Sequence, residues 1–282
     1  MDKMNKKSFF IIFSIILCIL LSGCTESSDK LSGEQKGGEN SISGSHGIGT
    51  DSLYQVSTID ALLQGVYDGA LSFKELKTHG DFGIGTIDGL DGEMLALDGN
   101  YYQIKTDGIA YSVSDNMTTP FATVTHFEAD EGYRLEKPMN LTELEQYLDR
   151  DLPSENFFYA IRVNGNFSYL KVRSVPKQEK PYRKLADVVS NQTVFEFKNV
   201  SGTLVGFKTP EYARGINVPG YHLHFIALNR NTGGHVLELE LGNGTALIDT
   251  KTAFYMELPT SGNFARVELG QDLKSELKTV EK

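Results

Sequence analysis

The sequence predicts an α+β fold with antiparallel or mixed β-sheets and a few short helices. Three observations support this prediction. Segments rich in β-branched and aromatic residues outnumber the helix signals, Gly, Asn and Asp separate these segments, and strands do not alternate regularly with helices. Such segments favour strands, and grouped strands with helices at intervals are typical of α+β proteins.

The N-terminal segment has the pattern of a lipoprotein signal peptide. Lysines precede an apolar run from Phe9 to Leu21, which is shorter than the ~20 residues that a membrane-spanning helix needs. The run ends in small residues followed by Cys24. We therefore expect residues 1–23 to be cleaved, Cys24 to carry lipid, and the body to be held at the membrane outside the cytoplasm. An uncleaved anchor helix is the alternative.

The composition of the remaining chain limits its organisation and chemistry. Residues 24–51 are rich in Ser, Gly, Glu and Lys, which predicts a flexible tether and leaves residues 52–282 as the folded domain. The net charge of −10 argues against a nucleic-acid partner. The two cysteines, Cys18 and Cys24, lie outside that domain, so His, Asp or Glu must hold any metal.

Helix and strand signals follow one another along the domain. The sequence indicates helices from Ser57 to Gly69, after Asn140 (capped with Glu143), over Tyr182–Ser190 and after Gln271. The predicted strands are Tyr101–Lys105, Ala110–Val113, Phe157–Val163, Ser168–Arg173, Thr193–Phe197, Gly202–Lys208, Tyr221–Leu228, His235–Leu241 and Ala246–Glu257.

Three histidines form the strongest chemical signal. His222 and His224 are two residues apart on a predicted strand and therefore share a face. His235 follows a turn-rich segment, residues 229–234. If the turn is centred between residues 229 and 230, His235 lies directly opposite His224, and His222 is the diagonal neighbour. A turn centred two residues later would place Leu228 opposite His235 and separate the cluster.

Three histidines without a cysteine match a catalytic zinc site, which keeps a position open for substrate. The alternative is a set of buried histidines that merely bond to the backbone. On the second strand we expect His235 to share a face with Leu237, Leu239 and Leu241. Glu238 and Glu240 would then point to solvent and are not expected to bind the metal.

Two further residues have a functional and an ordinary interpretation. Glu93 follows the glycine-rich segment 85–92 at the start of a strand, where it would face a cleft or simply be solvated. Arg173 ends a predicted strand, where it would clamp a substrate carboxylate or lie on the surface.

The chain resembles the alpha-acetolactate decarboxylase family from about Tyr54 to Glu281. The matching motifs are Gly85–Met94, Phe158–Arg162, Arg173–Pro176, Val194–Phe197, Gly202–Pro210, Asn217–Phe225 and Gly233–Leu237. Several separate motifs in the family's order are more specific than any one of them.

The resemblance implies a fold of two mixed β-sheet subdomains with a few short peripheral helices. It also implies a role for each candidate residue. The family's zinc ligands fall on His222, His224 and His235, its arginine on Arg173, and its two glutamates on Glu93 and Glu281, with Glu276 as the alternative to Glu281.

The implied reaction is the zinc-dependent decarboxylation of alpha-acetolactate (2-hydroxy-2-methyl-3-oxobutanoate) to acetoin and CO₂, a step of acetoin and butanediol metabolism. Zinc would stabilise the charge that develops on the substrate, Arg173 would orient the carboxylate, and Glu93 or Glu281 would deliver a proton. Family members often form homodimers. The alternative function is a lipid-tethered protein of the same fold that binds a metal or small ligand without catalysis.

Overall fold

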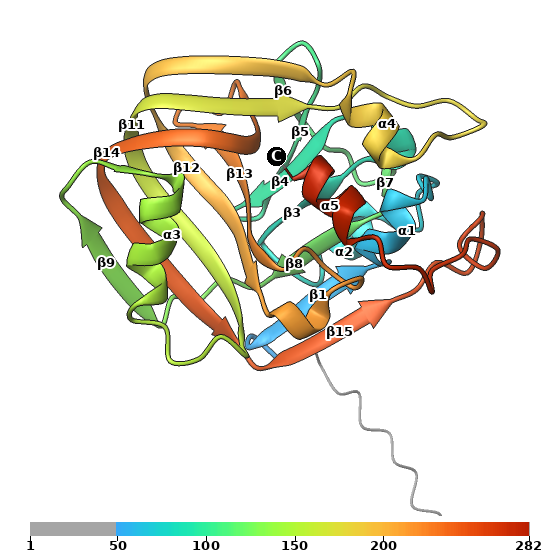
Figure 1. The fold of residues 1–282 in the computed structure, drawn as a ribbon, viewed down its shortest axis with the longest axis horizontal. Coiled ribbons are helices and arrows are strands. Elements are labelled where there is room, and N and C mark those ends of the chain that lie inside the picture. The colour runs from blue at the N-terminus through green and yellow to red at the C-terminus, as the bar shows by residue number, and fades with distance from the viewer. Residues whose placement is uncertain (1–48, 282) are drawn as a thin grey trace, which may run out of the picture. The chain divides into compact units, whose positions relative to one another are not determined.

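The computed structural model describes residues 49–281, which form two main β-sheets and several short helices (Figure 1). The first sheet has seven strands in the order β15-β1-β8-β3-β4-β5-β6. Their bounds are β1 Ser52–Val56, β3 Phe82–Thr86, β4 Glu93–Leu97, β5 Asn100–Ile104, β6 Ala110–Ser112, β8 Ala122–Thr125 and β15 Ala253–Glu257. β1 and β15 are parallel, and the other pairs of this sheet are antiparallel.

The second sheet has six strands, and each of its pairs is antiparallel. Their bounds are β9 Glu131–Leu135, β10 Met139–Asn140, β11 Phe158–Ser174, β12 Thr193–Thr209, β13 Gly220–Ala227 and β14 Gly233–Lys251. Because β13 also pairs with β14, the strands β14, β11, β12 and β13 close into a small barrel. A two-stranded sheet joins β2 (Leu71–Ser72) to β7 (Thr118–Thr119).

Short helices lie around the two sheets (Figure 1). They are α1 Ile59–Leu63, α2 Phe73–Leu76, α3 Leu141–Asp149, α4 Leu185–Val189 and α5 Lys274–Val280, with 3₁₀ turns η1 Asp88–Leu90 and η2 Glu211–Ala213. α3 packs against β10 and β14, whereas α1, α4 and α5 contribute to one shared apolar cluster. The α+β prediction is confirmed at this coarse level, although strands predominate and only the first sheet is mixed.

A buried apolar layer holds the two sheets together. Leu95 and Leu97 of β4 and Val205, Phe207 and Ile226 of the second sheet belong to one cluster. Each contributing strand presents alternate residues to this layer, as the two-residue repeat of a strand requires. The opposite faces of β12 and β13 fill the interior of the barrel. β4 and β13 are therefore neighbours across the layer, an arrangement that positions the site.

The helix predictions hold with corrected bounds. α3 has the predicted capping box, because the Asn140 side chain accepts from the Glu143 N–H and the Glu143 carboxylate accepts from the Asn140 N–H. The predicted start of α1 at Ser57 is wrong, since Thr58 caps the helix. Its predicted end at Gly69 is also wrong, because the chain turns at Gly65 with φ of +84°. The predicted tail helix is α5, and the helix predicted over residues 182–190 is the shorter α4.

Several strand predictions were incomplete. The structure joins Phe157–Val163 with Ser168–Arg173 in β11, and Thr193–Phe197 with Gly202–Lys208 in β12. The first part of the predicted strand Ala246–Glu257 belongs to β14, which also contains His235–Leu241, and the rest forms β15. The strand expected to start at Glu93 is β4. The sequence pattern did not indicate β1, β2, β3, β7, β8, β9 or β10. The predicted signal peptide, Cys24 and nearly all of the tether lie outside the described residues. Within residues 49–281 no helix is long and apolar enough to span a membrane.

Candidate metal centre and active site

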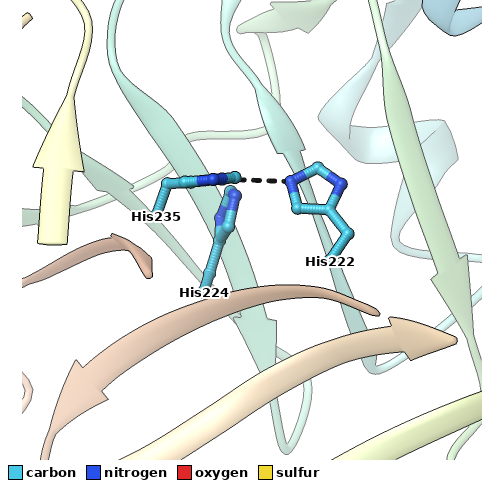
Figure 2. Close-up of side chains that lie close together, drawn as sticks. All are labelled: His222, His224 and His235. Carbon is cyan, nitrogen blue, oxygen red and sulfur yellow. Dashed lines mark hydrogen bonds between the residues drawn. The ribbon is translucent and has the colours of Figure 1, made fainter. Parts of the chain in front are cut away.

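The three histidines converge in the structure as the turn register predicted. β13 and β14 pair with His224 directly opposite His235, which confirms a turn centred between residues 229 and 230. Figure 2 shows the three imidazoles pointing toward one another. One ring nitrogen from each histidine lies within 4.8 Å of the others, and Nε2 of His222 is 3.2 Å from Nδ1 of His235.

Strand alternation directs these side chains away from the barrel interior. Leu223 and Phe225 fill the barrel, so His222 and His224 project from the other face of β13, toward β4. The predicted alternation along β14 is wrong, because the pairing shifts between Lys171–Glu238 and Val172–Val236.

This bulge leaves Leu237 without a partner on β11. As a result Val236, and not Leu237, lies beside Leu239 and Leu241 in the barrel core. Glu238 and Glu240 are nevertheless exposed, as predicted, and Glu238 pairs with Lys171. Neither glutamate belongs to the histidine cluster.

Backbone contacts fix the ring of His224. Its Nδ1 donates a hydrogen bond of 2.9 Å to the Met94 carbonyl oxygen on β4. Nε2 is then the nitrogen with the free lone pair, and it is buried without a hydrogen-bond partner among the described residues. An unsatisfied buried nitrogen of this kind is costly, and a bound cation would satisfy it.

The histidines are held in their neutral form, which is the form that binds metals. Burial lowers the pKa of His222 to about 3, and the Arg173 guanidinium adds to this shift. Burial also lowers the pKa of His224 and of His235 well below the usual value, and Arg173 and the neighbouring imidazoles add to this shift.

Two glutamates flank the histidines from different parts of the fold. Glu93 begins β4 on the same face as Leu95 and Leu97, and its Oε2 lies 3.6 Å from Nε2 of His224. Glu281 follows α5, and its Oε2 lies 3.7 Å from Nε2 of His235 and 3.9 Å from Nε2 of His222.

The structure thus places Glu281, rather than Glu276, beside the histidines. Glu276 accepts a hydrogen bond from the neighbouring Ser275 instead. Glu93 is buried, so the interpretation of this residue as a solvated hairpin side chain is wrong.

Burial gives both glutamates an unusual affinity for protons. It raises the pKa of Glu93 to about 7, while the Arg173 guanidinium opposes the shift and the Glu281 carboxylate adds to it. Burial likewise raises the pKa of Glu281 to about 7, against the opposing charge of Arg173. Each carboxyl can therefore hold a proton near neutral pH.

Arg173 is part of the site and not a surface residue. It pairs with His235 across β11 and β14, and 4% of its surface is exposed. Its Nε lies 3.9 Å from Oε1 of Glu93, and its Nη1 donates a 3.1 Å hydrogen bond to Oε1 of Gln192. Nε has no hydrogen-bond partner among residues 49–281.

The three histidines, Arg173 and the two glutamates line a cavity of about 40 Å³. The apolar lining comprises Ile59, Leu62, Leu90, Phe121, Val175, Leu185 and Val280. Sequence reasoning missed this wall, because its members come from scattered loops and helices. It also missed Thr86, which lines the cavity and pairs with Glu93 across β3 and β4. The glycine-rich motif that contains both residues was the available signal.

The whole domain matches known proteins. The family model described as alpha-acetolactate decarboxylase matches residues 53–271. This chain belongs to the alpha-acetolactate decarboxylase family. A relative of that name from Methanosarcina mazei is 63% identical, and the alignment covers 99% of this chain and 100% of the relative. A relative of the same name from Bacillus licheniformis is 43% identical over 82% of this chain and 92% of its own length.

Solved structures agree with this family membership. The crystal structure of alpha-acetolactate decarboxylase from Bacillus subtilis strain 168 superposes with a TM-score of 0.80 and 42% identity, over 82% of this chain and 99% of that one. A Staphylococcus aureus protein of unknown function similar to alpha-acetolactate decarboxylase superposes with a TM-score of 0.76 and 30% identity, over 81% and 98%.

Proposed function

We propose that this protein is a zinc-dependent decarboxylase that converts alpha-acetolactate to acetoin and CO₂. The observation that carries the proposal is the convergence of three neutral imidazoles, those of His224 and His235 buried, beside a buried arginine and two glutamates with raised pKa values. The names of relatives that match nearly the whole domain support the same substrate and reaction.

The residues present fit a zinc ion. Three imidazole nitrogens without thiolates are a ligand set of catalytic zinc sites. The buried Nε2 of His224, which has no partner among the described residues, favours a metal over histidines that bond only to backbone. When bound, zinc would supply Lewis-acid stabilisation of negative charge as CO₂ leaves.

The other side chains have separate tasks in this proposal. Arg173 would bind the substrate carboxylate and hold it in the orientation from which CO₂ departs. The apolar wall would contact the methyl groups and exclude water. Glu93 or Glu281 would deliver a proton to the carbon that loses CO₂, and burial favours this role because it raises the pKa of both carboxyls in the metal-free protein.

We also propose that the protein is a lipoprotein anchored to a membrane through Cys24, with its body outside the cytoplasm. The support is the basic, apolar and small-residue pattern of residues 1–24. A homodimer remains a prediction that rests on the family resemblance.

Acetoin formation and zinc content of the purified protein test the proposed function. We expect about one zinc per chain and conversion of alpha-acetolactate to acetoin. His224→Ala should lose zinc and activity together, because it removes a ligand. His126→Ala is the matched control, since His126 lies outside the cluster, and it should retain both. Full activity after complete zinc removal would refute the metal role, and substrate binding without turnover would favour the tethered binding protein.

A further inference from the structure

Gln192 contacts Arg173 from outside the cavity. Oε1 of Gln192 accepts a 3.1 Å hydrogen bond from Nη1 of Arg173. Gln192 does not line the cavity, whereas Arg173 does. An effect of Gln192 on substrate must therefore pass through the guanidinium.

The fold keeps Gln192 in place at the junction of α4 and β12. The backbone N–H groups of Asn191 and Gln192 donate to the carbonyls of Val188 and Val189, which closes the end of α4. Val188 and Val189 are buried in the apolar cluster that also contains residues of α1 and α5. β12 begins at the next residue and pairs with the end of β11 that carries Arg173.

The neutrality of this acceptor has a chemical consequence. Arg173 already lies near Glu93 and Glu281, whose carboxyl groups reduce the positive field it offers to an anion whenever they are ionised. A third carboxylate at residue 192 would form a charge-assisted pair with the guanidinium and compete with an incoming anion. An amide oxygen can instead fix the direction of the planar guanidinium without neutralising its charge.

We infer that Gln192 is a positioning residue, which orients Arg173 and preserves its charge for the carboxylate of a 2-hydroxy-3-oxo acid. This inference rests on the proposed function, because it assigns carboxylate binding to Arg173. It predicts that changes at Gln192 weaken ligands that carry a carboxylate and leave ligands without one nearly unaffected.

Two substitutions separate orientation from charge. Gln192→Met keeps the approximate shape and removes the acceptor, and Gln192→Glu keeps the acceptor and adds a charge. Asn191→Leu is the control, since Asn191 is the exposed neighbour at the same helix end. Arg173→Lys provides a reference for a damaged carboxylate site.

The probes are 2,3-dihydroxy-2-methylbutanoate, which has a carboxylate, and butane-2,3-diol, which has none. Calorimetry on the zinc-loaded protein would measure the affinity of both. We expect Gln192→Met and Gln192→Glu to weaken the acid by roughly 10-fold or more, the usual effect of a hydrogen bond to a charged group. The diol affinity and zinc content should change less than about 2-fold, because each substitution acts only on the guanidinium of Arg173, by removing its hydrogen bond or by pairing with its charge. KM for alpha-acetolactate should rise in parallel.

The outcomes are distinguishable. Unchanged acid affinity in Gln192→Met would overturn the positioning role, and unchanged acid affinity in Gln192→Glu would overturn the need for a neutral acceptor. Equal losses for acid and diol would show a merely structural role. If the unaltered protein makes no acetoin, the proposed function fails, while the acid and diol affinities still decide the role of Gln192.

Discussion

At the scale of single residues, the environment of each side chain decides its chemistry more than its type does. Glu93 and Glu238 are both strand glutamates, but one is buried beside His224 and the other pairs with Lys171 in solvent. Burial disfavours the charged carboxylate, so Glu93 can hold a proton at neutral pH, as a proton donor must.

Glu93→Gln tests this role directly. The amide keeps the size and hydrogen bonding of the carboxyl but has no transferable proton. We expect zinc content and fold to be retained and turnover to fall roughly 10²–10⁴-fold, the usual range for a positioned acid or base. Acetoin formation and zinc content would be measured beside Glu238→Gln, which should behave as the unaltered protein. Normal turnover in Glu93→Gln would transfer the proton delivery to Glu281.

The sequence revealed the site residues to different extents. The convergence of His222, His224 and His235 could be predicted from the two-residue repeat of a strand and from the position of the turn, because both depend only on residues near each other in the sequence. Glu93, Arg173 and Glu281 were identified through the family resemblance, since nothing local distinguishes them from solvated residues. Gln192 carried no signal, because its role depends on a contact with a strand 19 residues away.

At the scale of elements, α5 brings Glu281 to the histidines of β13 and β14. This helix lacks a side-chain cap at its start, and it is held by the buried side chains of Leu273, Leu277 and Val280. Val280 also forms part of the cavity wall. The position of Glu281 therefore depends on a small apolar contact between α5 and its neighbours, chiefly α4.

Leu277→Ala should loosen this contact. Loss of a buried leucine side chain costs about 2–5 kcal/mol, which is enough to detach so short a helix. We expect lower turnover with unchanged zinc content, because the three histidines lie on other elements. Lys278→Ala is the exposed control on the same helix. Activity and amide hydrogen exchange of α5 would be compared, and full activity with a detached helix would remove Glu281 from the mechanism.

The elements also show where local patterns stop being informative. α3 was predicted with its cap because both partners are three residues apart. The bulge at Leu237 was not, because it arises from pairing between β14 and β11, which lie far apart in the chain. β3 escaped prediction as well, since a strand buried on both faces lacks the polar–apolar alternation that marks a half-buried strand.

At the scale of the whole molecule, the proposed lipid anchor at Cys24 would decide where the reaction takes place. Cys24→Ala should abolish lipid attachment, because it removes the acceptor thiol. We expect the variant in the soluble extracytoplasmic fraction or retained with an uncut N-terminus, and the unaltered protein in the membrane fraction. Fractionation and mass spectrometry of the N-terminus would distinguish these states. An unaltered protein that is attached to the membrane with an intact, unacylated N-terminus would contradict the lipoprotein proposal.

The site lies where the two sheets meet, since Glu93 belongs to one sheet and the histidines to the other. A charged carboxylate at Glu93 lowers the free energy of unfolding of the domain, because burial disfavours the charge. In the metal-free protein, the pKa of Glu93 is about 7, against 4.5 for the ordinary carboxyl. Between these pH values the native state binds the extra proton, so the contribution of Glu93 to stability falls as pH rises and is lost above pH 7.

Glu93→Gln removes this penalty, because the amide has no proton to lose. At 1.36 kcal/mol per pKa unit, metal-free Glu93→Gln should be more stable than the unaltered protein by about 3 kcal/mol above pH 7, and by almost nothing below pH 4.5. Urea unfolding in the presence of a chelator would measure the difference across this range. Glu238→Gln should show no such trend, because that side chain is exposed. A gain that does not vary with pH would show that the pKa of Glu93 is not raised in the metal-free native protein, and the argument from burial for Glu93 as proton donor would fail.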